Sequence, residues 1–169
     1  MPGLISSQED NKIILRKILI PVCQSNEAHK AIQWYVNNLK LPGDLIIFLH
    51  ILEPNLPSAL SGLSSQYEST PNNSNYYVSE KNMTRARSLC HELVHEANSH
   101  GIKSEAMIQI DTKPGPAIVK IINEQQIDNI IMFKRSLNFI KRAITGSVSS
   151  YILHHSNIPV TILSSSMNH

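Results

Sequence analysis

Residues 91–95 read His-Glu-Leu-Val-His, the spacing at which metalloproteases hold zinc with two histidines one helical turn apart and activate water with the glutamate. The apolar residues around this motif favour a simpler interpretation. Leu93 and Ala97 mark the buried side of a helix, and at about 100° per residue His91 and His95 fall nearly opposite, on a solvated face. We therefore interpret the motif as an exposed helix face and keep a zinc hydrolase as an alternative hypothesis.

A second set of residues suits an anion. Gly146 and Ser147 stand at the start of an expected helix, where unpaired backbone amides and the helix dipole favour negative charge. The segment before them, 134–145, contains four basic residues and no acidic residue. The candidate anion-binding residues are Lys134, Arg135, Gly146 and Ser147.

The cysteines and the remaining histidines also need an interpretation. Cys23 precedes an expected helix and is either a redox-active thiol or, as is commoner for a cysteine with no partner nearby, a small apolar filler. Cys90 belongs to an apolar helix stripe and is expected to be inert. His50 ends an apolar strand and is expected to be a structural histidine with satisfied hydrogen bonds. His154 and His155 point about 100° apart on a helix, which favours surface or capping roles.

Composition limits the classes of protein. The chain has 169 residues, of which 41% are hydrophobic and 17% charged, as in one globular domain. Fifteen basic and thirteen acidic residues give a net charge of +2, too little to indicate a specific nucleic-acid partner. Two cysteines cannot form a disulfide framework and no apolar run is long enough for a membrane helix, so we expect a cytoplasmic protein without a membrane segment. The expected strand ends supply no paired carboxylates and no nucleophile beside a base, so we expect no enzyme.

The pattern of apolar residues predicts strands and helices that alternate along the chain. Continuous apolar runs predict buried strands, and apolar residues three and four apart predict amphipathic helices. The expected strands cover 13–22, 45–52, 103–110, 129–133 and 158–163. The expected helices run from an N-cap at Ser25 to Leu39, from Ser79 to His100, from Pro114 to Ile122 and from Gly146 to His155, with Gly101 ending the second.

This alternation predicts an α/β fold, a single-domain, doubly wound, five-stranded parallel sheet with helices on both faces. The domain is expected to cover 13–165, between a polar N-terminal tail at 1–12 and a C-terminal tail at 166–169. A segment at 53–79, rich in Ser, Asn, Pro and Tyr, is expected to be a mobile insertion. Ligands of such sheets bind outside the carboxyl ends of the strands.

Four segments lie at those strand ends and at the C-terminus. They are RKILIPV at 16–22, LHIL at 49–52, IDNIIM at 127–132 and KRAITGSVSSYILHHSNIPVTIL at 141–163. In these segments the chain resembles the universal stress protein family, a nucleotide-binding α/β class. The resemblance implies a Rossmann-like sheet with the strand order 3-2-1-4-5.

ATP-binding members of that family share a glycine, two residues, a second glycine, nine residues and then Gly-Ser or Gly-Thr. Aligned on Met132, the first glycine is replaced here by Phe133 and the second by Ser136, whereas Gly146 and the serine after it are kept. The aspartate expected near the base is replaced by Cys23. Phosphate-loop glycines let the backbone approach an anion closely, so the resemblance implies a degenerate cleft with weak or absent binding of ATP or another adenine nucleotide.

The family pose also assigns residues to parts of the nucleotide. It places Pro21, Cys23 and Ile51 around the base, Met132 and Phe133 at the ribose, and Ser136, Gly146, Ser147 and Val148 at the phosphates. The same resemblance implies a homodimer through the last strand, in which Val160, Thr161, Ile162 and Leu163 meet their counterparts.

Three functions are therefore compared. The first is a non-enzymatic, stress-related binding or regulatory module with a degenerate nucleotide cleft and an unidentified regulatory protein partner. The second is a genuine ATP-binding member, with or without slow hydrolysis. The third is the zinc hydrolase of residues 91–95.

Overall fold

The computed structural model describes residues 14–23, 26–54, 78–133 and 146–164. The predicted tails at 1–12 and 166–169, all but the ends of the predicted insertion at 53–79, and the basic segment 134–145 lie outside the described residues. None of the described helices combines the length and the apolarity that crossing a bilayer requires.

Strands and helices alternate along the described chain, as predicted. The elements are β1 (Arg16–Val22), α1 (Glu27–Asn38), β2 (Asp44–Leu52), α2 (Glu80–Ser99), β3 (Lys103–Ile110), α3 (Pro114–Glu124), β4 (Asn129–Phe133), α4 (Ser147–His155) and β5 (Val160–Leu163). The strands form one sheet in the order β3-β2-β1-β4-β5, and every pair is parallel. The predicted fold and strand order are confirmed.

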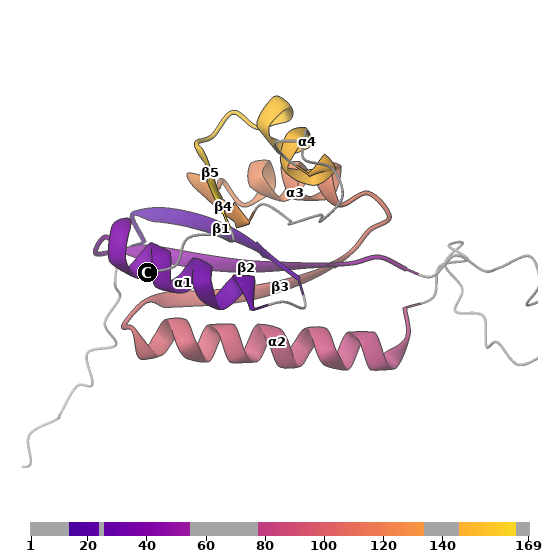
Figure 1. Cartoon of the computed structure of the whole chain (residues 1–169), viewed down its shortest axis with the longest axis horizontal. Helices are drawn as coiled ribbons and strands as arrows, with labels where there is room; N and C mark the ends of the chain where they lie inside the picture. The colour runs from indigo at the N-terminus through magenta and orange to yellow at the C-terminus, as the bar shows by residue number, and fades with distance from the viewer. Residues whose placement is uncertain (1–13, 24–25, 55–77, 134–145, 165–169) are drawn as a thin grey trace, which may run out of the picture.

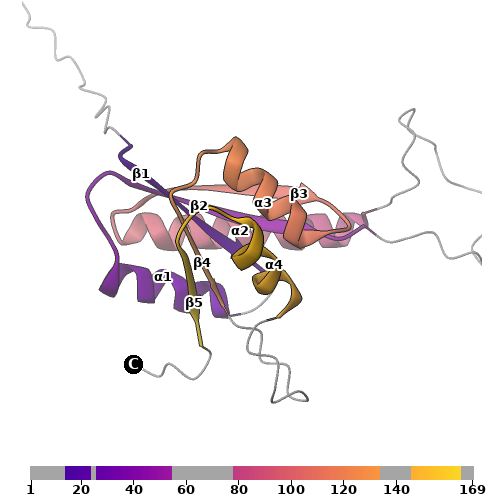
Figure 2. The ribbon, with the colours of Figure 1, turned by 90° about the horizontal axis from the view of Figure 1, so that it is seen from above.

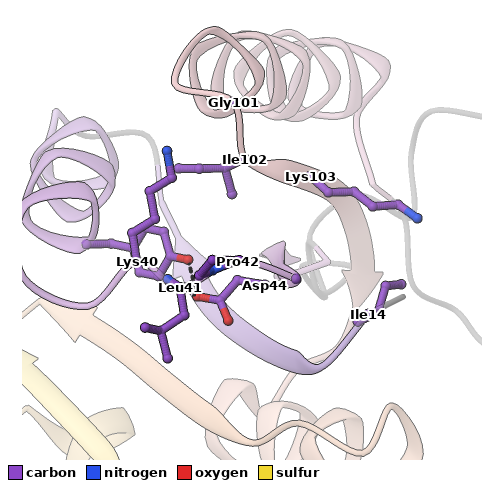
Figure 3. Close-up of a pocket in the computed structure, with 10 residues that line it drawn as sticks. Ile14, Lys40, Leu41, Pro42, Asp44, Gly101, Ile102 and Lys103 are labelled. Atoms are coloured by element: carbon purple, nitrogen blue, oxygen red, sulfur yellow. Dashed lines mark hydrogen bonds between the residues drawn. The ribbon is translucent and has the colours of Figure 1, made fainter. Parts of the chain in front are cut away.

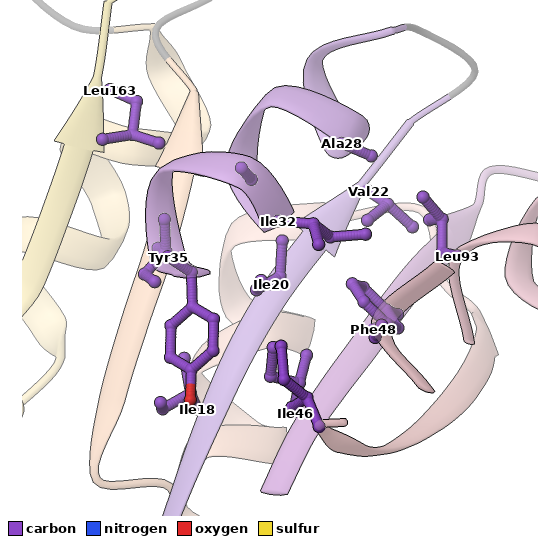
Figure 4. Close-up of a cluster of buried hydrophobic side chains, with 14 residues drawn as sticks. Ile18, Ile20, Val22, Ala28, Ile32, Tyr35, Ile46, Phe48, Leu93 and Leu163 are labelled. Carbon is purple, nitrogen blue, oxygen red and sulfur yellow. The ribbon is translucent and has the colours of Figure 1, made fainter. Parts of the chain in front are cut away.

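Two helices cover each face of the sheet, and Figures 1 and 2 show this layering. On one face, α1 and α2 bury Tyr35, Leu93 and neighbouring side chains against Ile20 and Phe48 of the central strands (Figure 4). On the other face, α3 and α4 pack against the alternate side chains of the same strands. Both faces are buried, which is why these strands read as unbroken apolar runs.

Two strands are shorter than predicted. β1 begins at Arg16 rather than at residue 13, because Ile14 and Leu15 precede the ladder that pairs Arg16 with Asp44. β5 begins at Val160 rather than at 158. α1 has Asn26 at its N-cap position with no side-chain capping bond, and the predicted cap Ser25 lies outside the described residues.

The boundaries of α2 follow the predicted chemistry. Ser79 Oγ accepts a hydrogen bond from the backbone amide of Asn82 at 3.2 Å, as an N-cap residue does. Gly101 follows the helix with φ +68°, a conformation that glycine adopts without steric cost. β3, which follows, is an edge strand, and its Ala106 and Ile110 are exposed.

Candidate functional site

The carboxyl ends of the parallel strands meet at one edge of the sheet. The β1–β2 ladder ends with Val22 opposite His50, and the β4–β5 ladder ends with Phe133 opposite Leu163. Since β1 lies between β2 and β4, the residues that follow these ends are neighbours in space. This edge is where a sheet of this class binds its ligand.

The residues assigned to the base come together at this edge. Pro21 is opposite Leu49 in the ladder, Cys23 follows the end of β1 directly, and Ile51 lies one residue before the end of the adjacent strand β2. All three predicted residues are half-buried. The side chain of Ile51 packs against the core under α3 and α4, so it belongs to that face of the sheet.

The two residues assigned to the ribose point to opposite faces. Met132 is 6% exposed and its side chain belongs to the core under α3 and α4. Phe133 is half-buried and packs against the core under α1 and α2. The structure therefore does not bring the two side chains together on one face of the sheet.

The N-terminus of α4 forms the described part of the predicted phosphate site. Gly146 is the N-cap residue, in extended conformation, and no side chain caps the helix there. Ser147 is exposed and Val148 is half-buried. A Cβ on Gly146 would lie 3.7 Å from Ser149 Oγ, an ordinary contact, so the described residues leave room for a methyl group there. The other predicted anion-binding residues, Lys134, Arg135 and Ser136, lie outside the described residues.

His50 is the buried histidine next to this edge. It is 4% exposed, and its Nδ1 donates a hydrogen bond to the carbonyl oxygen of Val22 at 3.0 Å. Burial lowers the pKa of His50, and the bond to Val22 opposes this only in part. A neutral histidine that ties β2 to the end of β1 is the structural role predicted for it.

The two cysteines lie in different environments. Cys23 is half-buried at the end of β1, and Cys90 is buried in α2, where burial raises the pKa of its thiol. The inert character predicted for Cys90 fits this position. On α4, His155 stacks on Tyr151 with ring centroids 3.9 Å apart and donates to the Tyr151 carbonyl, as expected for a capping residue.

The histidines of the zinc motif face solvent. His91 and His95 are exposed on α2, as the helix geometry predicts. Glu92 points towards α1, with its carboxylate 3.5 Å from Nε2 of His29. Among the described residues there is no group of three or more side chains that could hold a metal ion. The motif therefore lies on the exposed helix face that the sequence predicts.

Two polar clusters were not predicted from the sequence. In the first, His29 of α1 donates from Nδ1 to Glu96 of α2 at 2.5 Å. In the second, at the amino edge of the sheet, the carboxylate of Asp44 accepts hydrogen bonds from Arg16 and from the hydroxyl of Tyr35. Nothing in the local sequence indicates either cluster, because their members come from separate elements.

Comparison with known proteins identifies the family. A model of the universal stress protein family matches residues 15–164, and the chain belongs to this family. The universal stress protein MJ0577 of Methanocaldococcus jannaschii is 24% identical over 160 residues, covering 89% of this chain and 96% of that protein.

Solved structures of the family share the fold. The universal stress protein of Archaeoglobus fulgidus in complex with dAMP has a TM-score of 0.61 at 17% identity, covering 89% of this chain and 98% of that one. A family protein of Arabidopsis thaliana with AMP bound has a TM-score of 0.58 at 16% identity, covering 90% of this chain and 93% of that one. These likenesses confirm the expected Rossmann-like architecture.

Proposed function

We propose that this protein is a non-enzymatic binding or regulatory module whose nucleotide cleft is degenerate, so that it binds ATP weakly or not at all. The observation that supports this most directly is Phe133. It stands where ATP-binding relatives have the first motif glycine, and its ring packs half-buried at the carboxyl end of β4. Glycine at this position lets the backbone approach a ligand closely, and any side chain there removes this freedom.

Two further substitutions act in the same direction. Cys23 replaces a carboxylate that accepts hydrogen bonds from a ligand, and a thiol is a weak acceptor. Ser136 replaces the second glycine and restricts the backbone of the phosphate loop. Because each loss of about 1.4 kcal/mol lowers affinity about tenfold, three such losses remove micromolar binding.

The test is a calorimetric titration of ATP into the native protein and into the variant Cys23→Asp, Phe133→Gly, Ser136→Gly. We expect little heat from the native protein and binding gained by the variant. Since Phe133 packs against the core, the thermal midpoint of the variant is measured first to confirm folding. The variant Glu105→Asp, on edge strand β3, is the control.

A genuine adenine-nucleotide-binding protein is the second candidate. It is favoured by the dAMP and AMP complexes of proteins with the same fold. Micromolar binding of ATP or AMP by the native protein would establish this candidate and refute the degenerate cleft. A phosphate-release assay on the same samples separates binding from slow hydrolysis.

We also propose that the amides at 146–148 bind phosphate or sulfate without a nucleoside. The N-terminus of α4 has no side-chain cap, and a Cβ on Gly146 would make only an ordinary contact, with Ser149 Oγ at 3.7 Å. Titration of inorganic phosphate should shift the amide resonances of Ser147 and Val148 in NMR spectra. Shifts spread evenly over the protein would contradict a site.

Assembly and location complete the proposal. We propose a homodimer through β5, because this edge strand is short and apolar and its Val160, Thr161 and Ile162 are only half-buried in one copy. We propose a cytoplasmic location, because Cys23 and Cys90 do not form a disulfide, as is usual for proteins of a reducing compartment.

A further inference from the structure

A cavity of about 340 Å³ opens at the amino ends of β1, β2 and β3. It is bounded by Tyr35 of α1, by the turn 40–44 that leads into β2, and by residues 101–103, which lead from α2 into β3 (Figure 3). This is the edge of the sheet opposite the nucleotide site, so the cavity is independent of the function proposed above. Its volume is at the lower end of the range for ligand pockets, about 300–1,000 Å³, and suits one or two apolar side chains.

The floor of the cavity is fixed and its charge is neutralised. The carboxylate of Asp44 accepts hydrogen bonds from Arg16 at 2.7 and 2.9 Å and from the backbone amide of Leu41 at 2.9 Å. The hydroxyl of Tyr35 donates to the same carboxylate, and Tyr35 is fully buried. A partner therefore meets a preformed floor with no unpaired negative charge.

Exposed apolar residues lie at the cavity and next to it in the chain. Leu15, Leu41 and Ile14 are 72%, 55% and 38% exposed, and they are three of the five large exposed hydrophobic residues in the described part of the chain. The amide of Leu15 donates to the carbonyl of Gly43 at 2.9 Å, so the backbone of Leu15 lies next to the cavity, which Ile14 and Leu41 line with their own atoms. Clustered apolar side chains beside a concavity are typical of a protein interaction site.

The charge at the rim is positive. Lys40 and Lys103 line the cavity, and Figure 3 shows them on either side of Ile102. Neither lysine has a carboxylate partner among the described residues, and Lys40 donates instead to the carbonyl of His100 at 2.6 Å. Both ammonium charges are thus available to a partner.

We propose that this amino-edge surface, defined by Ile14, Leu41, Lys40 and Lys103 around the cavity, docks an acidic segment of another protein that carries an apolar anchor residue. The anchor fills the apolar cavity, and carboxylates beside it approach the two lysines. Hydrophobic anchors with a charged rim of opposite sign are the common arrangement of such interfaces.

The test uses the full-length protein and the synthetic peptide acetyl-Glu-Asp-Leu-Leu-Asp-Glu-amide. Titration followed by NMR should give saturable shifts in the amides of Gly43, Gly101 and Lys103. The variants Leu41→Asp and Lys40→Glu/Lys103→Glu should each weaken binding at least about tenfold, a loss of about 1.4 kcal/mol. Leu153→Asp on α4 and Lys81→Glu on α2 make the same changes at exposed positions outside the cavity and should leave binding unchanged.

Several outcomes would overturn the proposal. Equal binding of a peptide with lysine in place of its acidic residues would show that the lysines of the protein do not select for acidic partners. Equal binding of a peptide with serine in place of leucine would show that no apolar anchor is needed. Shifts confined to the carboxyl edge of the sheet, or no saturable shifts, would remove the site. Shifts at Gly43 and Gly101 that depend on protein concentration alone would assign the surface to a second copy of the chain.

Discussion

Arg16 donates two hydrogen bonds to the carboxylate of Asp44, from Nε to Oδ1 at 2.9 Å and from Nη2 to Oδ2 at 2.7 Å. The two residues open β1 and β2 and are paired directly in the ladder. Nη2 also donates to the carbonyl of Leu39 at 2.8 Å, so one guanidinium joins both strands to the end of α1. This bidentate geometry is the one in which arginine binds a carboxylate most strongly.

Asp44→Asn should therefore destabilise the protein by about 3 kcal/mol, because it leaves a largely buried guanidinium without its counter-charge. The side chains of Arg16 and Asp44 are 23% and 2% exposed. Urea denaturation measures the change. Glu124→Gln, which breaks the exposed Lys120–Glu124 pair, is the matched control and should cost about 0.5 kcal/mol or less. Equal costs for the two variants would contradict a special role for Asp44.

The same carboxylate should also make stability sensitive to acid. Burial alone would raise the pKa of Asp44, but the hydrogen bonds from Arg16, Tyr35 and Leu41 outweigh it, and the net pKa is lowered. The unfolded state therefore binds the proton first, near pH 3.8, and the stabilisation is lost as the pH falls through the lower, folded pKa. Below pH 4, Asp44→Asn should lose this dependence.

His50 should produce a second pH dependence, nearer neutrality. Burial lowers its pKa below 6.5, so the unfolded chain gains a proton that the folded chain resists. Unfolding free energy should fall as the pH drops below about 6.5, by at most about 1.4 kcal/mol per pH unit. The variant His50→Asn removes the titrating side chain and should make the unfolding free energy depend less on pH. The control His91→Asn, at an exposed position, should keep the pH dependence of the native protein. Parallel profiles for all three proteins would refute the assignment.

Gly115 should not tolerate a larger residue. A Cβ there would lie 3.0 Å from the ring of Tyr151, closer than packed atoms normally approach, because α3 crosses α4 at this point. Gly115→Val should cost about 2 kcal/mol through overpacking. The double variant with Tyr151→Ala should lose less than the sum of the two single losses, which a double-mutant cycle measures. Additive losses would show that the ring is not the obstacle.

The dimer proposed through β5 makes its own prediction. Light scattering at tens of micromolar protein should give twice the mass of the 18.9 kDa chain. Thr161→Lys places two like charges across a twofold axis and should yield monomers. Gln109→Lys puts the same charge on β3, the other edge strand, and should leave the dimer intact. A monomer in the native protein would exclude this assembly.

The sequence predicted the sheet well because both of its faces are buried. Runs such as the one in β2 are apolar at nearly every position, so their length and their alternation with amphipathic helices are visible without coordinates. The ends of the strands were predicted less accurately than the strands themselves. Ile14 and Leu15 are apolar but exposed, and only the hydrogen-bonded ladder shows that β1 starts after them.

Side-chain clusters were the part that local patterns could not supply. Arg16 and Asp44 are 28 residues apart, and their pairing depends on the register of two strands. His29 and Glu96 are 67 residues apart, and they meet only because α1 and α2 lie side by side on one face. The candidate site was predicted as a set of strand ends, and three of its predicted residues, at 134–136, lie outside the described part of the chain.

The central place of β1 in the sheet has a consequence for how the chain folds. In the sequence, β2 and β3 are the next strands after β1, and in the sheet both lie on one side of it. Once residues up to Ile110 have left the ribosome, three neighbouring strands and the helices α1 and α2 are therefore available to fold together. The other edge of β1 stays unpaired until β4 has been made. The two strands pair Leu19 of β1 with Ile130 of β4, residues that are far apart in sequence. Long-range pairing of this kind slows folding. Until β4 has been made, this edge of β1 is unpaired, and an unpaired strand edge is prone to associate with other chains.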